Sequence, residues 1–415
     1  MVKPPADDIL IAGASYVGLA LALALDRLVG SDLKITVLDR SPLRTPVADP
    51  RAFAIAAASK HLLEAIGVWP GLAGDAQSVA AIDITDSRLD HAIRPVLLSY
   101  DNATDAGQPA TWIVPAGPLR HALLEAIASR PHIEVIAPAA IAGVGIDPAG
   151  AVVHLEGGRG RIGRLLVAAD GAHSIVRREV GIKTVAWSWE QVGIVASVAH
   201  AKPHRARATQ HFLPGGPFAI LPLVGDRSCI TWSEAADEGR RIVALDDAGF
   251  TAELERRFGY RLGDLKLDGP RAIWPLEHHV ARSLVARRVA LVGDAARSVH
   301  PIAGQGLNLG LRDVAALAQT TADTLRVGLD AGDATGLERY QQWRRFDAGM
   351  SAAAYGALNA LFSNDSAVLR AARGVGLGVI DRLPALKQSL VGEAAGLTGE
   401  IPLLMRSGMT AARRA

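Results

Sequence analysis

The sequence predicts an α/β fold in three parts: a discontinuous domain built on a parallel sheet, an inserted and mostly antiparallel β domain, and a C-terminal helical segment. A buried strand, a glycine turn, an apolar helix and a second strand fill the first forty residues, and parallel strands require such a helical crossover. Strand-like patterns dominate from about residue 192 to residue 274. A buried, parallel-type strand then returns at residues 288–292, and helical patterns follow it.

The segments that belong to a parallel sheet stand at both ends of the chain, so the first domain is expected to be interrupted by the second. We assign residues 1–78, 106–184 and 280–345 to the first domain. Residues 79–105 and 185–279 form the inserted domain, and residues 346–415 form the C-terminal helical region.

The individual elements follow from hydrophobic periodicity and from turn residues. Strands are expected at residues 9–12, 34–38, 133–136 and 164–169, and a hairpin at 142–155 turns at residues 147–150. Helices are expected at 19–28, at 59–66 with Gly67 closing the helix, at 119–129, and near 246–258 as the one helix of the inserted domain. Residues 79–100 are strand-like and irregular, and a long helix begins near Gln305.

Composition excludes several classes of protein. The formal net charge is +2 and no Lys/Arg tract is present, so a nucleic-acid partner is not expected. The single cysteine, Cys229, rules out intramolecular disulfides and metal sites built from several thiolates. Its strand-like flanks predict a thiol packed in the core, which suits a reducing compartment.

The apolar run from Ile9 to Leu25 does not predict a membrane span or a signal peptide. Asp7 and Asp8 precede it where a signal peptide has basic residues, and a turn interrupts it. A cytoplasmic protein is expected, either free or attached peripherally to the inner face of a membrane. The glycine-rich apolar tail from residue 371 to 409 leaves two interpretations open: a helix that docks on a membrane or a partner, and a helix that packs on the first domain.

The first motif that carries chemistry is the turn at residues 13–18 (GASYVG), followed by Asp39. A glycine turn after a strand lets the backbone approach a pyrophosphate at a helix N-terminus, and a carboxylate that ends the second strand can accept ribose hydroxyls. A strand–turn–helix without a ligand is the alternative. The acidic residue at the expected distance favours the dinucleotide site.

The second motif is the strand at residues 165–169 with Asp170 and Gly171 at its carboxyl end, where ligands of open α/β sheets bind. Ser174 is expected to cap the next helix, with Arg177 near its first turn. Taken alone, Asp170-Gly171 is more often an ordinary turn.

The third motif, residues 292–310 (VGDAARSVHPIAGQGLNLG), is the most specific. A strand ends at Gly293-Asp294, and a loop passes through Gly304 and Gly306 into a helix. The free N–H groups of such a helix start suit an anion or the electron-rich edge of a flavin, where negative charge develops on reduction. The alternative is a purely structural loop.

In this order and spacing, the three motifs resemble those of the class A flavoprotein monooxygenases, the para-hydroxybenzoate hydroxylase group. The segments DPRAFAI (49–55), TQHFLP (209–214), FAILPL (218–223) and HPIAGQGLNLGLRD (300–313) narrow the resemblance to the ubiquinone-biosynthesis ring hydroxylases of the UbiH/UbiF type. It spans nearly the whole chain and thins after about residue 361. It implies a Rossmann-type FAD-binding domain with an inserted substrate domain.

The resemblance also implies a role for individual residues. Around the FAD pyrophosphate and adenosine ribose it places Gly13, Ser15, Gly18, Asp39 and Arg51. It assigns Asp170 and Gly171 to the motif associated with both FAD and NAD(P)H. It implies that Asp294 contacts the ribityl chain. Along the isoalloxazine it places Pro301, Gly304, Gln305, Gly306, Leu307 and Asn308, of which Pro301, Gly304, Gln305 and Gly306 stand nearest to the chemistry.

The implied reaction uses FAD, with NAD(P)H as a transient electron donor because the sequence has no second glycine fingerprint. A flavin C4a-hydroperoxide would hydroxylate the ring of a phenol, which the resemblance makes polyprenylated and lipid-soluble. Contact with a membrane or with a biosynthetic complex would follow. Gln210 and Phe212 are expected to face the substrate.

No catalytic base and no metal site are assigned. His211 and His300 are candidate bases by their chemistry alone, and a hydrogen-bonded structural histidine is an equal interpretation. The neighbours His278 and His279 point to opposite faces of a strand and rarely share a metal.

The sequence departs from the family pattern at three places: Ser15 replaces a glycine, Arg297 replaces a histidine, and Ala116-Gly117 replaces a polar pair. The departures at Ser15 and Arg297 leave a non-catalytic role possible, and three other functions stay open in all. They are hydroxylation of a small soluble aromatic acid in a pocket that carries arginine, FAD-dependent reduction of isoprenoid chains without O2, and a non-catalytic role in FAD binding or assembly.

Overall fold

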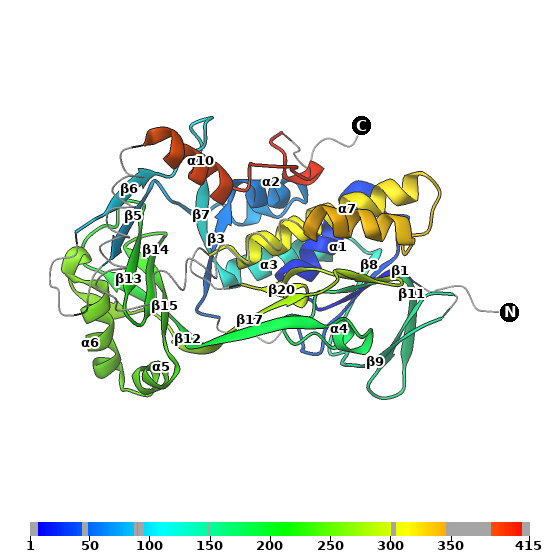
Figure 1. Ribbon diagram of the computed structural model, residues 1–415, viewed down its shortest axis with the longest axis horizontal. Helices are drawn as coiled ribbons and strands as arrows, with labels where there is room; N and C mark the ends of the chain where they lie inside the picture. The colour runs from blue at the N-terminus through cyan, green and yellow to red at the C-terminus, as the bar shows by residue number, and fades with distance from the viewer. Residues whose placement is uncertain are drawn as a thin grey trace.

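The computed structural model describes residues 7–43, 49–86, 89, 95–147, 149–299, 304–345 and 383–408. Two halves lie side by side, one built on an eight-stranded sheet and the other on a nine-stranded sheet (Figure 1). The long strands β12 (Thr184–His200) and β17 (Ala272–Ala281) run from one half into the other. Their pairing fixes the two halves relative to each other.

The eight-stranded sheet has the order β18–β19–β11–β1–β2–β8, and the hairpin of β9 and β10 is attached to β11. The strands β19, β11, β1, β2 and β8 pair in parallel, as the strand–helix–strand start of the chain predicts. The bounds are β1 (Asp7–Ala12), β2 (Ile35–Leu38), β8 (Ile133–Ile136), β9 (Ile141–Ile146), β10 (Ala151–Leu155), β11 (Gly160–Ala168), β18 (Val285–Ala286) and β19 (Val289–Leu291).

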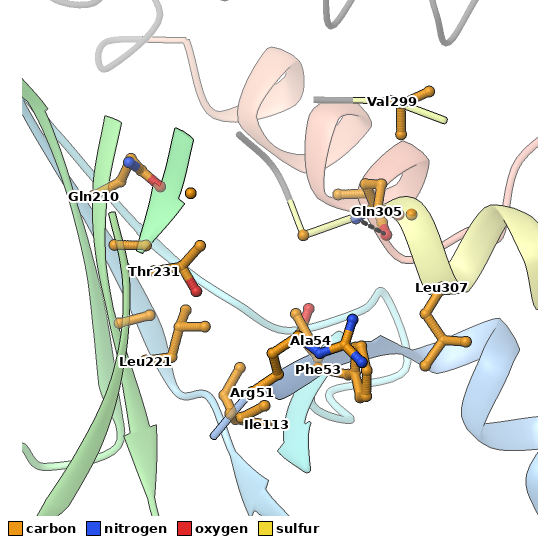
Figure 2. A pocket seen from close by; sticks show the side chains of 18 of the residues that line it. Arg51, Phe53, Ala54, Ile113, Gln210, Leu221, Thr231, Val299, Gln305 and Leu307 are labelled. Atoms are coloured by element: carbon orange, nitrogen blue, oxygen red, sulfur yellow. Dashed lines mark hydrogen bonds between the residues drawn. The ribbon is translucent and has the colours of Figure 1, made fainter. Parts of the chain in front are cut away.

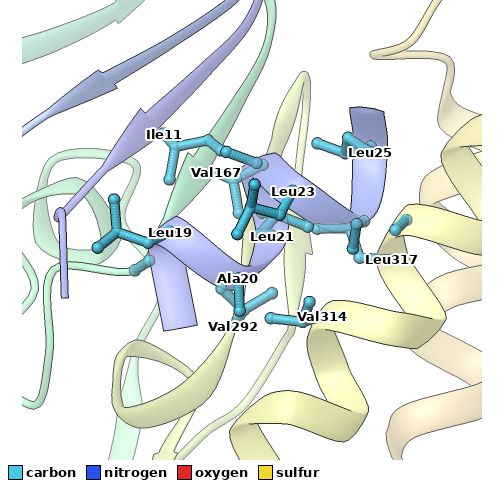
Figure 3. Close-up of a cluster of buried hydrophobic side chains, with 14 of the residues drawn as sticks. Ile11, Leu19, Ala20, Leu21, Leu23, Leu25, Val167, Val292, Val314 and Leu317 are labelled. Atoms are coloured by element: carbon cyan, nitrogen blue, oxygen red, sulfur yellow. The ribbon is translucent and has the colours of Figure 1, made fainter. Parts of the chain in front are cut away.

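Helix α1 (Tyr16–Val29) is apolar because it is enclosed on nearly all sides. It packs between the parallel sheet and helix α7 (Gly306–Arg326), and Figure 3 shows its leucines against Val167 and Val314. Leu19, Leu21 and Leu23 have no exposed surface, and truncating such a side chain to alanine costs about 2–5 kcal/mol. The apolar run is therefore core. Among the described residues, no helix is long and apolar enough to cross a bilayer.

The nine-stranded sheet has the order β20–β17–β12–β15–β14–β13–β5–β6, with β16 attached to β12. It is mostly antiparallel, and β5 pairs with β13 in parallel. The bounds are β5 (Ala81–Asp86), β6 (Leu98–Asp101), β13 (Arg207–Leu213), β14 (Gly216–Leu223), β15 (Arg227–Ala235), β16 (Leu265–Leu267) and β20 (Arg297–Ser298).

Alternation along these strands separates the two faces of the sheet. Ile194 and Trp232 pack with Phe250 in the core under helices α5 (Ala236–Val243) and α6 (Asp247–Phe258). Val195 and the neighbouring apolar residues face the other way, toward the first half. The sequence predicted a single helix here. It missed α5 because that short segment, ADEGRRIV, is mostly charged and buries only Gly239 and Ile242.

A small sheet of β3 (Ala52–Ala56), β7 (Thr111–Pro115) and β4 (Gln77–Ser78) lies beside helices α2 (Ala57–Ala65) and α3 (Ala116–Ala128). Residues 334–345 are helical, and helix α4 (Ile175–Glu179) follows the second motif. The short 3-10 turns are η1 (Trp69–Gly71), η2 (Tyr260–Leu262), η3 (Gly293–Ala295) and η5 (Leu403–Met405).

The described part of the C-terminal region, residues 383–408, packs on the body of the protein. Helix α10 (Pro384–Ala394) lies above the junction of the two halves in Figure 1, near β6 and α2. The Ala395 carbonyl accepts from the Ala58 N–H at 3.0 Å, and Met405 is buried with its carbonyl 3.1 Å from His61 Nδ1. For these residues the packed interpretation of the tail holds, and residues 346–382 and 409–415 lie outside the described part of the chain.

Candidate cofactor and substrate site

One cavity of about 800 Å³ lies between the parallel sheet and the nine-stranded sheet. Figure 2 shows Gln305 and Leu307 on one side of it, Leu221 and Thr231 on the other, and Arg51 below. Of the residues predicted to bind the cofactor, those that line the cavity are Ser15, Arg51, Gly171, Asp294, Gly304, Gln305, Gly306 and Leu307.

The glycine turn after β1 is dictated by close backbone packing. Gly13 has φ +107°, and a Cβ there would lie 2.3 Å from the Ala169 carbonyl oxygen. A Cβ on Gly18 would lie 1.9 Å from the Gly13 carbonyl oxygen. Because both obstacles are backbone atoms, only glycine fits at either position. The ends of β1 and β11 therefore meet directly.

Ser15 replaces a glycine without strain, because its φ of −95° is open to any residue. It is the N-cap of α1, where no side chain caps the helix and no acidic residue lies in the first turn. The free amides of that turn can therefore receive an anion. Asp39 lies just behind, where its carboxylate accepts from the N–H groups of Ala14 at 2.7 Å and Ser41 at 2.8 Å. It is close to the turn but does not line the cavity.

Asp170 closes the N-terminus of α4. One carboxylate oxygen accepts from the Ile175 N–H at 2.8 Å, whereas Oδ1 is buried with no hydrogen-bond partner among the described residues. Ser174 caps α4 as predicted, with its hydroxyl accepting from the Arg177 N–H at 3.0 Å. The second motif is therefore a built helix start with an acceptor left over.

The second and third motifs are in direct contact. The Arg177 guanidinium donates to the Ala295 carbonyl at 2.8 Å and lies 3.1 Å from His279 Nε2. The same His279 nitrogen lies 2.9 Å from the Asp294 carbonyl oxygen. Burial, and then the charge of Arg177, lower the pKa of His279, which keeps the ring neutral.

Asp294 presents its carboxylate to the cavity from η3. The surrounding protein removes the carboxyl from water and so raises the pKa of Asp294, although the charges of Arg51 and Arg297 act in the opposite direction. Gly293 and Gly310 both approach Val17, so that η3, α1 and α7 meet at one point. This contact sets the direction in which Asp294 projects.

Helix α7 starts at the cavity wall without a side-chain cap and without an acidic residue in its first turn. Gln305 and Leu307 line the cavity, but Asn308 does not. Its amide bridges to β3, accepting from the Ala56 N–H at 2.9 Å and donating to the Ala54 carbonyl at 2.7 Å. Asn308 thus fixes the helix start against β3. The predicted Pro301 and the candidate base His300 lie outside the described residues.

Arg51 lies at the floor of the cavity, bound to Asp49 through Nη2 at 2.7 Å and Nε at 2.9 Å. Burial alone would raise the pKa of Asp49, but the hydrogen bonds and charge of Arg51 lower it. Tyr16 donates to the same carboxylate at 3.3 Å, and burial followed by the charge of Asp49 raises its pKa to about 12. Arg51, Asp49 and Tyr16 thus form one hydrogen-bonded group, at the place where the resemblance puts the FAD phosphates.

The nine-stranded sheet supplies the opposite wall. Gln210 and Phe212 line the cavity, as expected from the sequence. His211 does not line it, and its Nδ1 lies 2.6 Å from the Thr85 hydroxyl within the sheet. The geometry gives it no access to the cavity. Cys229 is buried, and burial raises the pKa of its thiol to about 12, which fits the predicted core role.

Sequence reasoning missed most of the cavity wall. Most of the missed residues on strands are apolar or aromatic, and they include Ile82, Ile84, Leu98, Tyr100, Ile113, Leu221 and Trp274. Helix α10 adds Lys387, Val391 and Ala394. Period-two alternation could have identified one face of each strand, but it does not say which face meets a cavity.

These features fit a flavin dinucleotide. The uncapped starts of α1 and α7 offer amides to a diphosphate and to the electron-rich edge of a ring, and Asp170 and Asp294 offer acceptors for hydroxyl groups. The remaining wall is apolar enough for a fused ring. The fold and the site together define a dinucleotide-binding oxidoreductase whose described cavity reaches from the cofactor motifs to the apolar face of the nine-stranded sheet.

Comparisons with known proteins give the family. The family model described as FAD binding domain matches residues 7–350, and the chain belongs to this family of class A flavin monooxygenases. FAD is accordingly its cofactor.

Relatives and solved structures agree with this assignment. The chain is 40% identical over 402 residues to "Ubiquinone hydroxylase UbiL" of Rhodospirillum rubrum, covering 96% of this chain and 92% of the relative. It is 31% identical to the "3-demethoxyubiquinol 3-hydroxylase" of Escherichia coli, covering 94% and 98%. The structure of p-nitrophenol 4-monooxygenase PnpA from Pseudomonas putida is similar in fold, with a TM-score of 0.80 at 18% identity, covering 96% and 100%.

Proposed function

We propose that this protein is an FAD-dependent monooxygenase that hydroxylates the aromatic ring of a polyprenylated phenol in ubiquinone biosynthesis, with NAD(P)H as electron donor. The names of its relatives support ring hydroxylation in this pathway. Per turnover, NAD(P)H, a proton, O2 and the phenol would give NAD(P)+, water and the hydroxylated ring.

The observation that carries the proposal is that a single cavity joins the cofactor motifs to the apolar face of the nine-stranded sheet. Bound FAD would supply the redox chemistry, taking electrons from NAD(P)H and activating O2. The chain itself would hold the cofactor at the starts of α1 and α7 and hold the ring against the sheet. Enclosure under α10 would keep water from the reacting atoms.

The lining supports a lipid-soluble substrate. Its branched apolar side chains continue from Leu221 past Ile82 and Ile84 to Leu98, beyond the wall that faces the predicted flavin. Burying apolar surface is worth roughly 25 cal/mol per Å², so a prenyl chain would add strongly to binding there. Such a substrate resides in the bilayer, which makes peripheral contact with the inner face of a membrane, or with a biosynthetic complex, part of the proposal.

The small aromatic acid is less well supported as a substrate. The cationic side chains that line the described cavity are Arg51 and Lys387. Arg51 is bound to Asp49, and the Lys387 amine donates to the Ser99 carbonyl at 3.0 Å. A free carboxylate would have to compete with these existing bonds.

Anaerobic addition of NAD(P)H to the purified protein, followed by air, tests the proposal. The yellow flavin spectrum should bleach, and it should return with O2 uptake that a prenylated phenol accelerates. A soluble phenolic acid that stimulates turnover where the prenylated phenol does not would favour the alternative substrate. A protein that takes up flavin but is never reduced by NAD(P)H would be a non-catalytic flavin binder.

A further inference from the structure

The cavity face of the nine-stranded sheet contains one row of residues in register across its strands. Pairing places Gln210 opposite Ala219, Ala219 opposite Thr231, and Thr231 opposite Val195. In the other direction, Gln210 pairs with Ile84, and Ile84 pairs with Leu98. All six residues line the cavity. The row is apolar except at Gln210 and Thr231, which flank the smallest side chain in it.

Gln210 has an unmet hydrogen-bonding capacity. Its Nε2 is buried and has no hydrogen-bond partner among the described residues. A buried donor without a partner is costly, so such groups usually have a partner in the working state. Figure 2 shows the Gln210 carboxamide and the Thr231 side chain projecting from the sheet toward the space that Gln305 and Leu307 face from the other side.

We propose that Gln210 and Thr231 are positioning residues that hold the oxygen-bearing substrate ring over Ala219, between the sheet and the flavin. This proposal rests on the proposed function and names the part of the site that recognises the ring. Neighbouring strands are about 4.8 Å apart, so the backbones at Gln210 and Thr231 are separated by roughly 10 Å. That interval admits one aromatic ring with a hydrogen bond at each end.

The same geometry assigns different roles to the rest of the row. Ala219 has no side chain beyond Cβ, and it leaves the space in which the ring would lie. Ile84 and Leu98 continue the row on the Gln210 side, where the wall is apolar and suits the prenyl chain. The ring would therefore be oriented by two polar contacts, and the chain would be directed toward β5 and β6.

Isosteric variants separate this role from a structural one. Gln210→Met and Thr231→Val remove the polar groups at nearly constant volume, and Thr231→Ser keeps the hydroxyl. Ile220→Leu is the matched control, because Ile220 packs in the core on the opposite face of the sheet. The probe is a phenol with one ten-carbon prenyl chain. Measured quantities are KM, kcat, the fraction of NAD(P)H that ends as hydrogen peroxide, and the melting temperature.

Gln210→Met and Thr231→Val should each raise KM about tenfold, as expected for one lost hydrogen bond, and should increase the peroxide fraction. Thr231→Ser should preserve the wild-type KM because it keeps the hydroxyl, and Ile220→Leu should behave like the wild type. Ala219→Leu should abolish hydroxylation while NAD(P)H still reduces the flavin. If both isosteric variants keep the wild-type KM and peroxide fraction, the positioning role of Gln210 and Thr231 is overturned and the proposed function stays intact. If the wild-type protein does not hydroxylate the probe, the proposed function is refuted, and with it the positioning role of the two residues.

Discussion

Arg297 Nη2 lies 2.9 Å from Oδ1 of Asp313 on α7, and both side chains are buried. Asp313 also accepts from Arg344 Nε at 2.9 Å and from the Gly293 N–H at 3.1 Å. The Arg297 side chain, which stands where the family has a histidine, thus points into the core and away from the cavity. It joins the third motif to α7 without touching the predicted cofactor position.

The charge balance of this cluster predicts unequal effects of two substitutions. Asp313→Asn removes the carboxylate that two buried guanidinium groups share and should reduce the free energy of unfolding by about 3–5 kcal/mol. Arg297→Met leaves the pair of Asp313 and Arg344 and should cost about 1 kcal/mol or less, since replacing a buried ion by an apolar group is often nearly neutral. Urea unfolding of both variants measures the difference. Equal losses would contradict the assignment of Asp313 as the carboxylate that Arg297 and Arg344 share.

The glycine turn gives a second prediction. Gly18→Ala places a methyl group against the Gly13 carbonyl, and this backbone clash should abolish flavin binding and lower the melting temperature. Ser15→Gly restores the usual fingerprint but changes only a residue with an ordinary φ, so flavin content should match the wild type within about twofold. The flavin-to-protein absorbance ratio after purification measures both. A Ser15→Gly protein with much more flavin would mean that the serine impairs the site.

The glycine turn and the side chains of the third motif differ in how far the sequence could predict them. Gly13 and Gly18 are required by local backbone contacts, so the motif alone located the turn, the helix start and the parallel strands. Asn308 and Arg297 lie in equally recognisable motifs, yet their side chains turn away from the cavity, because their partners on β3 and α7 are brought near only by tertiary packing.

The substrate wall was predictable only in part for the same reason. The strand pattern of the segment around Gln210 predicts two faces, and the sequence correctly placed Gln210 and Phe212 on the cavity side. The row that joins Gln210 to Thr231 depends on strand register, which no short-range pattern encodes. The contribution of α10 depends on where the chain returns after more than three hundred residues.

The buried histidine pair predicts acid sensitivity. Burial is the main cause that lowers the pKa values of His278 and His279, so the unfolded chain binds protons more readily than the folded one. The stability that the neutral rings provide is fully present above their unfolded pKa of about 6.5 and is lost as the pH falls toward the lowered folded values. His279→Gln should therefore flatten the decline of the urea midpoint between about pH 7 and pH 5. A decline in His279→Gln as steep as that of the wild type would contradict this prediction.

Asp294 gives opposite predictions for the flavin-free and the flavin-bound protein. Its surroundings raise the pKa of the carboxyl, so the folded state binds a proton more tightly than the unfolded chain does. The cost of the ionised form is absent at low pH and grows as the pH rises through the ordinary aspartate range toward the raised value. Asp294→Asn removes that cost, and the flavin-free variant should melt at the same temperature as the flavin-free wild type or higher at pH 7.

Flavin binding should respond to the same substitution in the other direction. If Asp294 accepts a hydroxyl of the ribityl chain, its replacement by a neutral amide loses a charge-assisted hydrogen bond, and the Kd for FAD should rise about tenfold to a hundredfold. The combination of an unchanged or higher melting temperature without flavin and a weaker Kd is specific to a carboxylate held ready for a ligand. A variant that loses stability without flavin and binds FAD normally would show that Asp294 supports the fold instead, because the raised pKa would then reflect burial that the protein compensates internally.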